Sequence, residues 1–148
     1  MTRHVFPYTD FQGEVSEAFP DGSKALRPVL HFFLSKGARS VTGHAFVDSG
    51  ADYCTFPGVW MAALGIDRSE ARLGSNLFSP IGSAPIFFCE VTMALPFTEP
   101  YPLYAGFAES MNNWNIGEEY MGIFGQVGFF DRFKVMFDAR NNSFEIET

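Results

Sequence analysis

Short apolar runs separated by glycine and proline make up most of the chain. The 14 glycines and 9 prolines are spread along its whole length, not gathered in one linker. Apolar runs bounded in this way are typical of strands and leave little room for long helices. The pattern predicts six strands, at residues 28–35, 41–47, 85–94, 102–107, 134–138 and 143–147. The last two flank the turn-forming sequence Ala-Arg-Asn-Asn, which predicts a terminal hairpin.

Two short segments have helical features. Residues 59–64 (VWMAAL) follow Pro57-Gly58 and stop at Gly65, which are start and stop signals of a short helix. Residues 129–133 (FFDRF) are expected to form one or two helical turns. The pattern as a whole therefore predicts a mostly β domain with one or two short helices.

Length and composition indicate one folded domain over residues 1–148. A chain of 148 residues is short for two domains and long enough to bury a real core. The content of 47% hydrophobic and 18% charged residues argues against intrinsic disorder. The 18 phenylalanines are more than a small core obviously requires.

Charge and cysteine usage exclude several function classes. The net charge of −7 argues against a nucleic-acid partner, because that affinity comes mostly from Lys and Arg. There is no apolar run near the ~20 residues of a membrane span and no signal-like opening segment, so we expect a cytoplasmic protein without a membrane partner. Cys54 and Cys89 are expected to be reduced and buried. His4, His31 and His44 lack metal-ligand spacing, so neither a metal nor a cofactor is expected.

Candidate chemistry lies where an apolar strand ends. Residues 45–47 run directly into Asp48-Ser49-Gly50-Ala51. A carboxylate at the end of a buried strand is costly unless something pairs with it or uses it. Gly50 allows a sharp turn and close approach by another chain, and Ser49 adds a small hydroxyl. Asp-Ser-Gly alone is a common turn; the preceding strand and the following alanine make the pattern more specific.

A second motif stands near residue 125. Ile123-Phe124-Gly125 is followed by Gly-Phe-Phe-Asp-Arg-Phe at residues 128–133. Together with residues 47–52, these motifs resemble the retropepsin-like aspartic proteases, particularly their small single-domain bacterial relatives. The similarity extends to Phe56-Pro57 and to Ala-Leu-Gly-Ile at residues 63–66, and spans about residues 28–146.

This resemblance implies a closed acid-protease-type β-barrel that hydrolyses peptide bonds in a peptide or protein substrate. Such chemistry needs two carboxylates that share one proton. Because the chain has a single Asp-Ser-Gly, the resemblance implies a homodimer in which each chain gives Asp48. Ser49 and Gly50 would support the two catalytic loops. The implied substrate-binding residues belong to the catalytic loop and to a flap: Gly50, Ala51, Asp52, Ile81 and Gly82.

The chain departs from the family pattern at three places. Retroviral relatives pair the second Asp of Asp-Thr-Gly-Ala-Asp with an Arg after the later Gly; Asp52 matches that Asp, but Gln126 replaces the Arg. The candidate flap, residues 78–84, has one glycine, and residues 74–76 are the alternative. Phe124 is larger than the aliphatic residue frequent in those relatives.

Two alternatives to the protease stay open. The first is a catalytically inactive peptide-binding module with the same fold, which the flap and Gln126 favour. The second is a small β-barrel that binds an apolar ligand among its phenylalanines. Ser49 as a nucleophile is disfavoured because no Gly-x-Ser-x-Gly elbow surrounds it. Cys54 is disfavoured because its setting is typical of a strand interior and it could pair only with a distant His. We expect residues 2–25 to form either the outer strand of the barrel or a strand at a subunit interface.

Overall fold

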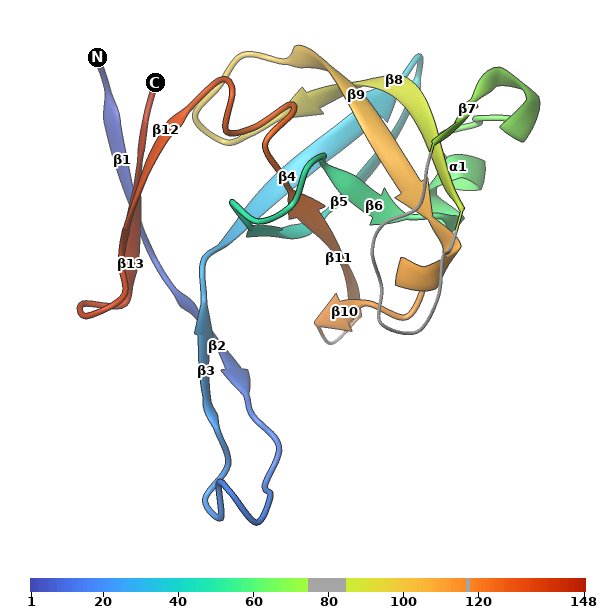
Figure 1. The fold of residues 1–148 in the computed structure, drawn as a ribbon. Coiled ribbons are helices and arrows are strands. Elements are labelled where there is room, and N and C mark those ends of the chain that lie inside the picture. The colour runs from blue at the N-terminus through green and yellow to red at the C-terminus, as the bar shows by residue number, and fades with distance from the viewer. Residues whose placement is uncertain (75–84, 117) are drawn as a thin grey trace. The chain divides into compact units, whose positions relative to one another are not determined.

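The computed structural model covers residues 1–148 and describes all of them except 75–84 and 117. The chain is mostly β and divides into two compact units (Figure 1). The larger unit is Leu30–Arg132, and the smaller unit combines Met1–Val29 with Phe133–Thr148.

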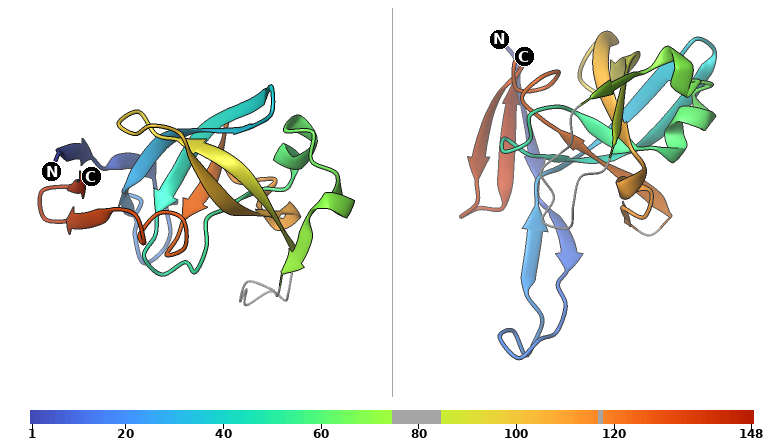
Figure 2. Two further views of the ribbon diagram at one scale, coloured as in Figure 1. Left: turned by 90° about the horizontal axis from the view of Figure 1, so that it is seen from above. Right: turned by 45° about the vertical axis from the view of Figure 1, so that its right-hand side comes forward.

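The larger unit is built around a closed β-barrel. Six strands form a ring in the order β11-β5-β4-β8-β9-β6, and β6 pairs back to β11 (Figures 1 and 2). The short strands β7 and β10 extend the ring at β8 and at β11. This confirms the predicted closed, mostly β barrel. The strands are β4 (Val29–Lys36), β5 (Arg39–Val47), β6 (Thr55–Pro57), β7 (Arg72–Gly74), β8 (Ile86–Ala94), β9 (Tyr101–Ala108), β10 (Asn115–Ile116) and β11 (Glu119–Phe124).

Strand β11 lies between β5 and β6. It runs parallel to β5, with Phe124 opposite Val47, and it pairs antiparallel with β6 where Ile123 faces Thr55. A segment from late in the sequence is thereby placed beside the end of β5. This arrangement brings the two sequence motifs together.

Aromatic side chains fill much of the barrel core. Phe32 packs on Phe56 and Phe124 with ring centroids 5.1 and 5.2 Å apart, and Phe124 stacks on Phe129 at 4.7 Å. Trp60 from helix α1 (Val59–Ala63) covers Phe32 at 5.6 Å. Many of the phenylalanines therefore belong to the core.

In the part of the chain that the structure describes, helices are few and short. Helix α1 confirms the segment predicted at 59–64, and the chain leaves it through Gly65 at φ +69°. Two 3-10 helices, η1 (Arg68–Glu70) and η2 (Glu109–Met111), were not predicted. Residues 129–133 form turns and no helix, because the amides of Phe130 and Asp131 bond five residues back, to Gly125 and Gln126.

The smaller unit is a three-stranded sheet with a separate hairpin. The sheet has the order β1-β13-β12, and the β12–β13 pair confirms the predicted terminal hairpin. Main-chain hydrogen bonds between Thr2 and Thr148 hold the first and last strands together. The first strand therefore pairs within its own chain and is no part of the barrel sheet. The strands are β1 (Arg3–Pro7), β2 (Thr9–Gln12), β3 (Lys24–Arg27), β12 (Lys134–Asp138) and β13 (Ser143–Glu147), with β2 and β3 forming the hairpin.

Within the described residues, no helix has the length and apolar character needed to span a bilayer.

Candidate functional site

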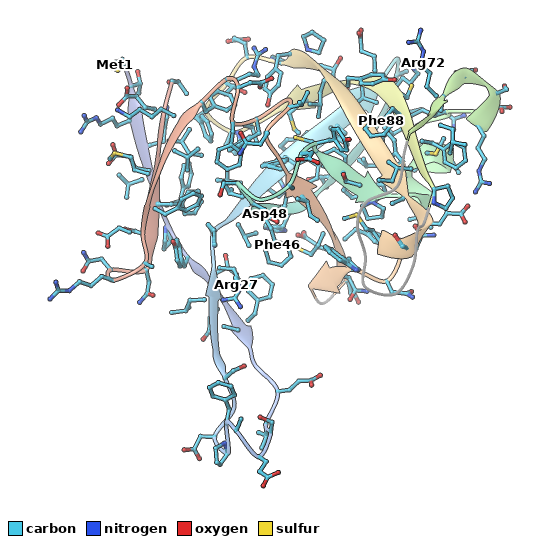
Figure 3. All side chains as sticks on the ribbon, in the orientation of Figure 1. Met1, Arg27, Phe46, Asp48, Arg72 and Phe88 are labelled. Atoms are coloured by element: carbon cyan, nitrogen blue, oxygen red, sulfur yellow. The ribbon has the colours of Figure 1, made fainter. Side chains whose placement is uncertain are left out.

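The loop that follows β5 carries Asp48. Strand β5 ends at the buried Val47, and the Asp48 amide donates to the carbonyl of Phe124 at 3.0 Å, which continues the pairing with β11. The Ala51 amide then returns to the Asp48 carbonyl at 3.2 Å and closes a turn. Figure 3 shows Asp48 at this end of β5. The main chain of Asp48 is thus fixed by a buried strand while its side chain is exposed to solvent.

The Asp48 carboxylate is oriented by its own loop. Its Oδ1 accepts a hydrogen bond from the Gly50 amide at 2.9 Å. A Cβ on Gly50 would lie 3.2 Å from the same oxygen, so the glycine leaves the carboxylate room in this position. Ser49 and Gly50 are exposed together with Asp48. A second molecule can therefore approach all three residues.

Residues 125–127 brace the loop from the other side. The amides of Gln126 and Val127 donate to the carbonyls of Ala51 and Asp52 at 2.8 and 2.9 Å. A Cβ on Gly125 would lie 2.3 Å from the Tyr53 carbonyl oxygen and 2.8 Å from that of Ala51. Only glycine fits this close approach, which explains why the apolar pair of β11 is followed by glycine.

Gln126 makes a neutral contact with Ser49 where the retroviral relatives have an Arg–Asp ion pair. Gln126, which stands at the Arg position of the retroviral relatives, donates from Nε2 to the Ser49 carbonyl at 2.7 Å. Asp52 is exposed and, among the residues that the structure describes, forms no ion pair. The sequence identified the missing charge but gave no indication of the contact that takes its place.

Cys54 is a buried structural thiol. Its Sγ accepts from the Gly125 amide and donates to the Val127 carbonyl, both at 3.5 Å. Burial raises the pKa of this thiol to about 12, and the hydrogen bond from Gly125 lowers it only in part. A neutral thiol of this kind is no nucleophile. Cys89 is also buried and forms no disulfide.

The histidines of the barrel lie outside this loop. Nε2 of His31 is 2.7 Å from the Thr42 hydroxyl, and Nδ1 of His44 contacts the Glu119 carboxylate. Both are partly buried and have polar partners, as expected of structural histidines.

The predicted flap, residues 78–84, lies outside the described residues. Strands β7 and β8 pair antiparallel, with Gly74 opposite Ile86, and their connection contains Ile81 and Gly82. Both residues lie outside the described residues, as does most of the alternative at 74–76. The structure thus brings the predicted site residues 48–52 together in one loop and leaves the two flap residues as predictions.

Comparison with known proteins gives a fold. No protein-family model and no curated protein matches the chain. Among solved structures, the fold is similar to that of a retropepsin-like aspartic protease. One such match is the crystal structure of a retropepsin-like aspartic protease from Rickettsia conorii. Its TM-score is 0.56 at 11% sequence identity, over 98% of this chain and 92% of that one. At this identity the likeness concerns the fold.

Proposed function

We propose that the chain is an aspartic endopeptidase, active as a homodimer in which each subunit contributes Asp48. One observation carries the proposal: in a retropepsin-like barrel, Asp48 ends a buried strand with its carboxylate exposed and held by the Gly50 amide. The two motifs that surround it, 48–51 and 123–125, meet in space as that class of site requires.

A single Asp48 supplies one of the two carboxylates that the reaction needs. One ionised carboxylate removes a proton from the attacking water, while a protonated one donates to the peptide carbonyl and later assists the leaving nitrogen. Two carboxylates about 3 Å apart cannot both ionise, so they share one proton. A two-fold axis beside the exposed residues 48–50 would supply the second Asp48.

The remaining loop residues have supporting roles in this proposal. The Ser49 hydroxyl hydrogen-bonds across the two-fold axis and holds the two loops together. Gly50, Ala51 and Asp52 bind an extended substrate strand, whose main chain pairs with the loop as an added β-strand. Ile81 and Gly82, which lie outside the described residues, stay the predicted flap residues of the substrate site.

Cleavage of an unstructured protein between pH 4 and 7 tests the proposed activity. Asp48→Asn should reduce the rate at least about 100-fold, the usual contribution of a general acid or base. Pepstatin should inhibit the wild type. The matched control is Asp21→Asn, which removes the same charge from an exposed turn of the β2–β3 hairpin. Equal cleavage by wild type and Asp48→Asn would eliminate the site, and an inactive wild type that still binds peptides would identify the peptide-binding module.

Mixing subunits tests the sharing of the dyad. When wild type and Asp48→Asn are refolded together at equal amounts, random pairing leaves about one quarter of the dimers with two Asp48 residues. The measured activity should therefore fall to about a quarter of that of the same total protein as wild type. An activity of one half would show that each subunit works alone and would contradict the shared site.

A further inference from the structure

The side chain of Gln126 reaches the candidate carboxylate through one peptide group. Its Nε2 donates to the Ser49 carbonyl at 2.7 Å, and the amide of the same Ser49–Gly50 peptide donates to Asp48 Oδ1 at 2.9 Å. The Ser49 carbonyl, which accepts, and the Gly50 amide, which donates, belong to the same planar peptide group. Three groups are thereby connected in series: the Gln126 amide, the Ser49–Gly50 peptide and the Asp48 carboxylate.

We propose that Gln126 is a positioning residue for Asp48, which fixes and polarises the Ser49–Gly50 peptide that holds the carboxylate. This rests on the proposed function only where catalysis is the readout. A hydrogen bond accepted at the carbonyl strengthens the amide as a donor, because hydrogen bonds in a chain polarise one another. It also fixes the rotation of the peptide plane, and with it the direction of the Gly50 N–H.

The main chain of Gln126 is itself held on both sides. Its amide donates to the Ala51 carbonyl at 2.8 Å, and its carbonyl accepts from the Asp131 amide at 3.0 Å. The side chain therefore starts from a fixed position and reaches Ser49 within the same short segment. A loose surface glutamine would lose more side-chain entropy on forming such a bond.

The neutrality of this contact has a chemical consequence. An Arg–Asp pair depends on an ionised carboxylate and weakens as that carboxylate is protonated. The amide of Gln126 carries no titrating proton between pH 4 and 7. The positioning of Asp48 should therefore persist across the acidic range in which aspartic proteolysis is expected.

Gln126→Glu provides the sharpest test because it keeps the shape of the side chain and, when ionised, replaces the donor with a negatively charged acceptor. An ionised Glu cannot donate to the Ser49 carbonyl, whereas a protonated Glu can. At pH 7 the variant should lose about fivefold in kcat, the factor of one net neutral hydrogen bond, with KM nearly unchanged. Toward roughly pH 4, where a glutamic acid protonates, kcat should return to within about twofold of wild type. Gln126→Ala should show the loss at every pH.

A second readout works without catalysis. Amide hydrogen exchange at Gly50, measured by NMR, should become about fivefold faster in Gln126→Ala at all pH values. In Gln126→Glu it should become faster at pH 7 only, after correction for intrinsic exchange. The control Asn113→Asp adds the same charge at an exposed position and should match wild type.

The two proposals fail in different ways. If wild type cleaves nothing but Gly50 exchange responds as described, the proposed function is wrong and the positioning role stands. If Gln126→Glu follows the wild-type pH profile and Gly50 exchange is unchanged in both variants, the positioning role is wrong, whether or not the wild type cleaves.

Discussion

Replacing Gly125 with alanine should damage the site without touching any reacting group. The added Cβ would lie 2.3 Å from the Tyr53 carbonyl oxygen and 2.8 Å from that of Ala51, where ordinary contact begins at 3.4 Å. Both neighbours are main-chain atoms, so no side chain can rotate out of the way. The difference between 3.4 and 2.3 Å requires the loop and the end of β11 to separate by about 1.1 Å.

The magnitude follows from this separation. Overpacking a closed site costs typically 1–3 kcal/mol, and the backbone contacts place Gly125→Ala at about 3 kcal/mol of unfolding free energy. For a chain of this size that lowers Tm by roughly 6–12 °C. A displacement of about 1 Å near the reacting group costs on the order of 100-fold in rate, even in molecules that remain folded.

Thermal unfolding and cleavage should be measured together at a temperature where the variant is folded. Gly37→Ala is the matched control: Gly37 sits in the β4–β5 turn at φ +59°, with nothing within 4 Å of an added Cβ. It should lose about 1 kcal/mol from its left-handed backbone and keep its cleavage rate. Gly125→Ala with the stability of this control and wild-type cleavage would refute the close-approach argument.

Other substitutions test the core, the thiol and the terminal hairpin. Phe32→Ala should lower the unfolding free energy by about 3–5 kcal/mol in urea, against under about 1 kcal/mol for the half-exposed Phe33→Ala; similar losses would contradict the packing described. Burial raises the pKa of Cys54 from 9.0 to about 12. Between pH 9 and about pH 12 the thiol therefore loses its proton in the unfolded state but keeps it in the folded state. Stability should therefore fall above pH 9, and less steeply in Cys54→Ala; identical slopes would contradict the assignment. The Asn141 side chain lowers the pKa of Asp138, so Asn141→Ala should move that pKa up toward 3.8 in an NMR titration. No movement would show that the contact is absent in solution.

Local patterning predicted the mostly β character and six of the strands that the structure describes. Strands β4, β5, β8 and β9 could be predicted because glycine and proline bound their apolar runs, and their ends agree with the sequence within two residues. Strands β6, β7 and β10, at three, three and two residues, are too short to show a period. The segment 129–133 was misjudged because its amides bond to the turn before it, which helix signals do not report.

The site was predictable only in part. Asp48 and Gly125 stood out through two motifs whose residue types are demanded by local geometry. The partners of Cys54 lie 71 and 73 residues away, and the Gln126–Ser49 bond spans 77 residues, so no short-range pattern contains them. In the proposed dimer the second Asp48 would come from another molecule, which the sequence indicates only indirectly, through its single Asp-Ser-Gly.

Because β11 pairs with both β5 and β6, the loop at residues 48–52 can take its folded form only after β11 has been synthesised. The long-range hydrogen bonds of residues 48–52 come from residues 124–127, which are translated about 76 residues after Asp48. At 5–20 residues per second this is a delay of roughly 4–15 s. During that interval the nascent chain carries the Asp-Ser-Gly sequence without the strand that shapes it. The proposed proteolytic site therefore cannot form while the chain is being synthesised, even if a second subunit is present.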